Sequence, residues 1–140
     1  MPLVVQINLL GSGSGFYTKN TSYTTWVLLE SGLGGAESEA ENTFGNTTEQ
    51  GGEIHRRRLS EIICLSGIYL GSQYKNNADD RDFFNYFYNN SDHSIADTSK
   101  AGANTKPSGQ HQLDWFRKGV DSGGRPSACN TWAAPASEVS

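Results

Sequence analysis

The chain has 140 residues and a formal net charge of −4, a length that supports one domain and leaves no room for two independent cores. Leu, Ile, Val and Phe make up only about one residue in five, close to the composition at which chains become disordered. The acidic balance disfavours nucleic acid as a partner, and no apolar run approaches the roughly 20 residues of a membrane span. The low net charge argues against full disorder, so these figures predict a loop-rich protein with a small core.

Two strands are predicted in the first 30 residues. Leu3–Leu10 places apolar and polar residues in alternation, and Tyr23–Glu30 contains Thr, Trp and Val, which favour an extended backbone. Gly11–Gly15 separates them, and its spacing fits neither a dinucleotide-binding loop nor a P-loop. We interpret this glycine-rich segment as a flexible turn in a hairpin with a long loop.

An acidic segment, residues 31–52, is interpreted as a mobile loop because it holds four glutamates and few large apolar residues. A basic run follows it directly. The simplest role of this charge reversal is that the arginines neutralise the acidic loop, either within one chain or across a contact between subunits.

The remaining predicted elements are short. Leu59–Leu70 fits both a strand and a helix, and we favour a strand, or a helix that ends near Ser66. Asn77–Tyr88 is the best helix, because aspartates lie in its first turns and aromatic residues follow at helical spacing. Ser91–Gln110 is predicted as a loop, and Leu113–Lys118 as one helical turn that docks two aromatic side chains.

These elements predict an α+β, β-leaning fold. It consists of a small antiparallel sheet with one or two short helices, long loops and an extended C-terminal tail. We expect residues 1–120 to form a single small domain with the acidic loop at 31–52, and residues 121–140 to form the tail, anchored by Trp132 alone.

The small apolar content favours a non-enzymatic subunit that assembles with copies of itself, of the capsid, tail or filament type. In such a protein, neighbouring copies would order the loops and the tail. The N-terminal strand and a set of aromatic and charged residues are expected at the contacts. That set is Phe83, Phe84, Phe87, Tyr88, Trp132, Glu37, Glu39, Glu41, Arg56, Arg57 and Arg58.

Two other function classes stay open. A carbohydrate-binding module would use Trp26 or Trp115 as a stacking platform for a sugar ring. A small hydrolase would use a histidine with a carboxylate. Membrane partners are not expected, and glycans remain a second partner class.

No cofactor and no metal site is predicted. The histidines are few and lack the spacing of a metal motif, so we interpret them as solvated surface residues. Cys64 lies in an apolar run, where a buried and unreactive thiol is the common situation. With Cys129 it forms either one long-range disulfide or a pair of free thiols, and the cellular compartment stays undetermined.

Overall fold

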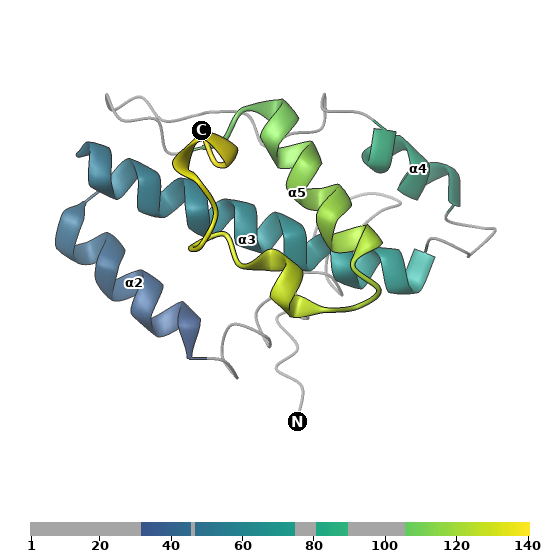
Figure 1. The fold of residues 1–140 in the computed structure, drawn as a ribbon, viewed down its shortest axis with the longest axis horizontal. Helices are drawn as coiled ribbons and strands as arrows, with labels where there is room; N and C mark the ends of the chain where they lie inside the picture. The colour runs from purple at the N-terminus through teal and green to yellow at the C-terminus, as the bar shows by residue number, and fades with distance from the viewer. Residues whose placement is uncertain (1–31, 46, 75–80, 90–105) are drawn as a thin grey trace, which may run out of the picture.

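The computed structural model describes residues 32–45, 47–74, 81–89 and 106–140, and in these ranges the chain is helical without any strand (Figure 1). The helices are α2 (Leu33–Phe44), α3 (Glu49–Tyr74), α4 (Arg81–Asn89) and α5 (Gly109–Asp121), followed by the short 3-10 helices η2 (Pro126–Cys129) and η3 (Ala136–Glu138). The long helix α3 runs through the middle, α5 crosses it, and α2 and α4 lie at its two ends (Figure 1). No helix in the described part of the chain is both long enough and apolar enough to span a membrane.

The prediction of an α+β, β-rich fold is therefore wrong for the described residues. Its central error lies at Leu59–Leu70, which is neither a strand nor a helix that stops at Ser66, but the middle of α3. The apolar residues of this run satisfy both periods, so periodicity alone could not decide between them. Packing against α5 decided it, because helical spacing brings Cys64, Leu65 and Ile68 onto one buried face.

Glycines let α3 and α5 approach closely. A Cβ atom on Gly67 of α3 would lie 2.2 Å from the carbonyl oxygen of Phe116, and one on Gly119 of α5 would lie 1.9 Å from the carbonyl oxygen of Cys64. A glycine in a helix interior costs about 1 kcal/mol relative to alanine. In the structure this cost is offset by the backbone contact that a side chain would prevent.

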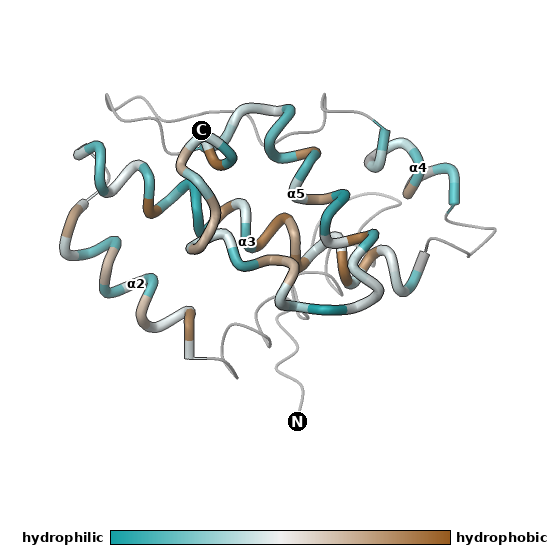
Figure 2. The backbone as a smooth tube through the Cα atoms, viewed as in Figure 1, coloured by the Kyte–Doolittle hydropathy of each residue, from teal (hydrophilic) through white to brown (hydrophobic). Residues whose placement is uncertain are grey.

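The core has two parts along this crossing. One part surrounds the disulfide between Cys64 and Cys129, and the other lies where α4 meets α5. Hydrophobic residues concentrate where α3 and α5 face each other, whereas α2 is mostly hydrophilic or neutral between its ends (Figure 2). The buried members of the two parts are Cys64, Leu65, Ile68, Trp115, Cys129 and Val139, and Leu70, Phe84, Phe116 and Val120.

The described residues of the acidic segment 31–52 are mostly helical, which contradicts the loop prediction. They form α2 and the first turn of α3, and Gly45, Thr47 and Thr48 lie between the two helices. Alanine and glutamate are strong helix formers, so a segment with few large apolar residues can still form a helix. Gly32 and Gly45 flank α2 with positive φ angles of 73° and 69°, so these two glycines mark its two boundaries and do not interrupt it.

The extended tail predicted for residues 121–140 is also wrong, because this segment folds onto α3 and α5. Val139 is fully buried, and Trp115 donates its indole N–H to the carbonyl oxygen of Glu138 over 2.8 Å. Arg57 of α3 donates hydrogen bonds to the carbonyl oxygens of Thr131 and Ala134. This C-terminal segment is thus held by contacts within its own chain.

The predicted helix Asn77–Tyr88 is confirmed from residue 81 onward as α4. The predicted single turn Leu113–Lys118 is longer in both directions and forms α5, which begins at the cap Ser108. The expected burial of Trp115 and Phe116 is confirmed. The predicted strands Leu3–Leu10 and Tyr23–Glu30, with Trp26, lie outside the described residues.

Candidate functional site

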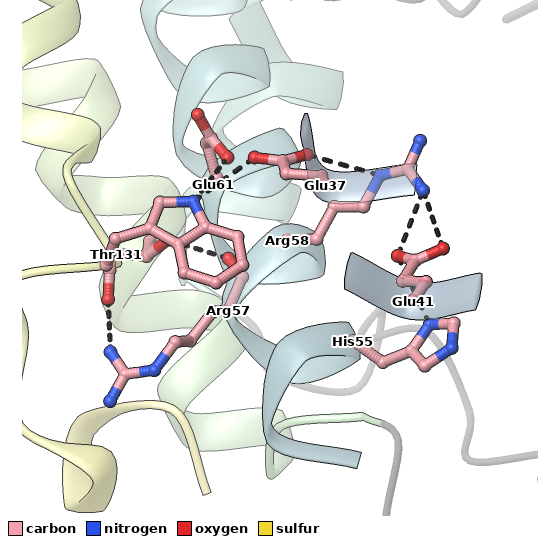
Figure 3. Close-up of polar contacts among 8 residues, drawn as sticks. Glu37, Glu41, His55, Arg57, Arg58, Glu61 and Thr131 are labelled. Atoms are coloured by element: carbon pink, nitrogen blue, oxygen red, sulfur yellow. Dashed lines mark hydrogen bonds and ion pairs between the residues drawn. The ribbon is translucent and has the colours of Figure 1, made fainter. Parts of the chain in front are cut away.

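A buried carboxylate cluster lies between α2, α3 and the C-terminal segment (Figure 3). Glu37 of α2 and Glu61 of α3 are 3% and 4% exposed. Both accept a hydrogen bond from the indole N–H of Trp132, to Oε1 of Glu37 at 3.2 Å and to Oε2 of Glu61 at 3.3 Å. One donor thus bridges carboxyl groups from two helices. We use "carboxylate cluster" for Glu37, Glu41, His55, Arg58, Glu61 and Trp132.

Arg58 supplies the positive charge of the carboxylate cluster. Its Nη1 donates to both carboxylate oxygens of Glu41 at 2.9 Å, and its Nε lies 3.3 Å from Oε2 of Glu37 (Figure 3). His55 adds Nδ1 at 3.5 Å from Oε1 of Glu41, a contact that gains charge only when the imidazole is protonated. Within the six residues of the carboxylate cluster, Arg58 is thus the one permanent cation beside three carboxyl groups.

The pKa of Glu61 is set by its burial and by the neighbouring carboxyl of Glu37. Burial of the carboxyl, together with the hydrogen bond and the charge of Glu37, raises the pKa of Glu61 from 4.5 to about 8. Trp132 and Arg58 act in the opposite direction but do not compensate. Because a buried carboxyl next to another carboxyl ionises at a high cost, Glu61 is mainly protonated at neutral pH.

The chemistry open to this arrangement is limited by access. A carboxyl pair that shares a proton can serve as general acid and base, but only where a substrate reaches it. Both Glu37 and Glu61 are covered, and Trp132, which is 37% exposed, lies with its N–H directed at them. The cluster joins α2 to the remainder of the chain, and its geometry suits a structural junction better than a reaction centre.

An open groove of about 760 Å³ along α5 is the other candidate site. Its charged side chains already pair with one another or with the backbone. Lys118 contacts Glu138 at 3.1 Å, Tyr88 donates its hydroxyl to Asp121 at 2.9 Å, and Arg117 donates to the carbonyl oxygen of Tyr88 at 2.7 Å. The hydrogen bond to Asp121, burial and the charge of Asp121 together raise the pKa of the Tyr88 hydroxyl above its ordinary value.

The predicted charge set is divided between two junctions. Glu37 and Glu41 meet Arg58 within the chain, as described above. Arg57 instead pairs with Glu53, one turn earlier in α3, and holds the C-terminal segment. Glu39 is exposed on α2, and Arg56 is half-buried on α3.

The predicted aromatic set lies mostly on α4. Phe84 is buried against Phe116, and Tyr88 is half-buried beside it. Phe83 and Phe87 belong to the same helix, but their side chains lie outside the described part of the structure. Trp132 lies in the carboxylate cluster, against Glu61 in the middle of α3.

The residues named for the alternative functions take other roles. Trp115 is 3% exposed, with its indole N–H bonded to the backbone and Lys118 over its ring, so it offers no face for stacking on a sugar. The cysteines form a buried disulfide, which settles the pairing left open by the sequence and removes Cys64 as a free thiol. No set of three or more candidate ligands that could hold a metal ion occurs among the described residues.

Sequence reasoning missed Glu61 and the contact of His55 with Glu41. The signal was present, because residues three or four apart share one face of a helix. His55, Arg58 and Glu61 have this spacing, but a strand prediction for the segment that contains Glu61 hides it.

Comparison with known protein families, with curated proteins and with solved structures finds no match for this chain.

Proposed function

We propose that the chain is a non-enzymatic, self-assembling structural subunit and that α2 is the arm which it exchanges between copies. The observation that carries this proposal is the manner in which α2 is attached. Its single buried side chain among the described residues is Glu37, while the large apolar residues Leu33 and Phe44 at its ends are 41% and 47% exposed.

A polar attachment suits an arm that has to leave and return. Releasing an apolar helix exposes hydrophobic surface at about 25 cal/mol per Å², whereas α2 exposes mainly ionisable groups that water solvates well. The partners of Glu37 and Glu41 on α3 are the same in every copy. An arm can therefore dock on a neighbouring copy with the same contacts that it makes on its own chain, which is the basis of domain swapping.

The link between α2 and α3 is short and conformationally demanding. Gly45 has a φ of +69°, and a Cβ atom on Gly51 would lie 1.5 Å from the carbonyl oxygen of Gly45. If residues 45–48 became helical, α2 and α3 would form one continuous helix and α2 would point away from its own chain. Short hinges of this kind favour exchange between copies.

The buried disulfide supports a location for this subunit. The chain has two cysteines, and they pair with each other in the core. Because disulfides persist mainly in oxidising environments, we place the assembled protein outside reducing compartments.

The first test changes the hinge. Gly45→Ala disfavours the left-handed turn, which costs an L-residue about 1–2 kcal/mol, and favours the continuous helix. We expect a larger fraction of dimers or higher oligomers by light scattering than for the unaltered chain at equal concentration. Gly35→Ala is the matched control, because a Cβ atom there meets nothing within 4 Å and should leave the mass unchanged. Monomers for both the unaltered chain and Gly45→Ala up to millimolar concentration would refute the proposal.

The second test uses complementary charges. Glu41→Arg and Arg58→Glu each place like charges opposite one another when the arm docks on its own chain. If the two variants are mixed, each arm finds an opposite charge only on the other variant. We expect mixed dimers by native mass spectrometry and far fewer from either variant alone, whereas an equal distribution would contradict exchange of α2.

A further inference from the structure

We propose that the carboxylate cluster is a pH-dependent latch that holds α2 on α3 in acid and releases it as the pH rises. This inference rests on the proposed function, because it states what regulates exchange of the α2 arm. Its structural basis is the bridge in which one indole N–H serves a carboxyl from α2 and a carboxyl from α3, both buried.

The groups around Glu61 decide the direction of the effect. Glu61 faces Glu37 of α2, and Glu41 lies one turn further along that helix. Arg58, on the same helix as Glu61, contacts both Glu37 and Glu41. The C-terminal segment contributes Trp132, which carries no charge. Ionisation of Glu61 therefore sets three carboxylates against one arginine, with His55 compensating only when protonated.

The sign follows from proton binding in the closed and open forms. In the closed form the pKa of Glu61 is about 8, and once α2 and the water-excluding contacts are gone it returns toward 4.5. Between these values, opening the latch releases a proton. The opening equilibrium constant should then rise up to about tenfold per pH unit and level off above the upper value.

The effect on assembly is kinetic. An arm docked on its own chain and an arm docked on a neighbour use the same carboxylate cluster, so protons bind both forms equally. A ligand with equal affinity for two forms does not shift the balance between them. The latch instead controls how often an arm is free, so exchange between copies accelerates toward alkaline pH and is arrested in acid.

Hydrogen exchange of the α2 amides tests the latch directly. After correction for the pH dependence of unstructured amides, we expect protection of α2 to decrease progressively from about pH 5 to pH 8 and to stay below that of α5, which opens only with the whole fold. Glu61→Gln retains the hydrogen-bonding side chain without the charge, and should leave only the part of this decrease that comes from the His55 contact. Glu39→Gln, on the exposed side of α2, should behave like the unaltered chain.

Carbon-13 NMR titration of the Glu61 carboxyl uses the unaltered chain, so its result does not depend on whether a variant folds. A midpoint near the ordinary value for glutamate, or α2 protection that does not change with pH, would overturn the latch.

Solution mass separates the two proposals. If α2 opens with pH but the protein stays monomeric throughout, the latch stands and the assembly proposal fails. If mixed labelled copies exchange at the same rate at every pH, assembly stands and the latch fails.

Discussion

Gly119 shows at the scale of one residue how a missing side chain determines the fold. Its hydrogen lies where a methyl group would meet the backbone of α3, and Gly67 makes the reciprocal approach toward α5. These contacts bring the backbones of two helices together without any side chain between them. The flanking residues Cys64, Phe116 and Val120 are buried as a result.

Gly119→Ala should therefore destabilise the protein despite the better helix propensity of alanine. The new Cβ atom would lie 1.9 Å from the carbonyl oxygen of Cys64, a backbone atom that cannot rotate away. Overpacking of this kind costs about 1–3 kcal/mol, which exceeds the roughly 1 kcal/mol gained from replacing glycine in a helix. Urea unfolding would measure the change, and an unfolding free energy equal to or above that of the unaltered chain would contradict the close approach.

Arg57 acts at the boundary between two segments distant in sequence. Its guanidinium donates to two carbonyl oxygens of the C-terminal segment and to Glu53, and the hydroxyl of Thr131 donates back to the carbonyl oxygen of Arg57. Arg57 therefore holds the C-terminal segment against α3, a role that its position in a basic run did not reveal.

Arg57→Ala should loosen the C-terminal segment and lower the unfolding free energy by about 2–4 kcal/mol, because partly buried carbonyl groups lose charged donors. Limited proteolysis near residue 131 should become faster. Lys118→Ala is the matched control, because it removes an exposed ion pair with Glu138 and the contact of the ammonium with the Trp115 ring, each of which contributes about 0–1 kcal/mol. Equal effects of the two substitutions would show that Arg57 has no special role.

At the scale of elements, α2 and the C-terminal segment are attached by opposite means. The C-terminal segment has a disulfide, a fully buried Val139 and backbone hydrogen bonds from α3. Helix α2 is instead attached through the carboxylate cluster. The chain thus fixes one peripheral element firmly and leaves the other dependent on charge.

The disulfide should account for much of the stability of this small core. It joins residues 65 positions apart, and closing a loop of that length stabilises a protein by about 4 kcal/mol in the chain-entropy description. We expect the double variant Cys64→Ala, Cys129→Ala to lose roughly that amount in urea unfolding. Reductant should weaken the unaltered chain and have no effect on the double variant, and an equal response of both would show that the bond does not form.

At the scale of the whole molecule, a chain with few aliphatic residues has to order its segments by other means. Its core is confined to the crossing of α3 and α5 and to α4, and the periphery depends on arginines, a tryptophan bridge and one disulfide. This arrangement makes global stability sensitive to pH, because a buried titratable pair replaces apolar contact at one end.

Stability should accordingly decrease from weakly acidic to weakly alkaline pH. The folded chain raises the pKa of Glu61 to about 8, so the contribution is complete below 4.5, the ordinary value, and is lost as the pH rises to the upper value. The slope is at most about 1.4 kcal/mol per pH unit. Thermal unfolding across this range measures it, and Glu61→Gln should flatten the profile, whereas an unchanged slope in the variant would assign the effect to other groups.

Local signals in the sequence predicted part of this structure. The acidic first turn and the aromatic spacing identified α4, and the burial of Trp115 and Phe116 followed from their place on a helical turn. The attraction of Glu37 and Glu41 to Arg58 was anticipated from charge order, whereas Arg57 pairs with Glu53 and Glu39 is exposed. These predictions depend on the order and spacing of residues along the chain, which can be read from the sequence.

The sequence by itself determined the helix at α4, the docking aromatic residues of α5 and the opposition of acidic and basic runs. Only the tertiary structure decided that Leu59–Leu70 is helical, that the C-terminal segment folds back, and that Glu61 joins Glu37 under Trp132. The reason is that an ambiguous apolar run, a glycine and a lone glutamate acquire their roles from residues far away in the chain, and the packing of α3 against α5 selects among alternatives that local spacing leaves equal.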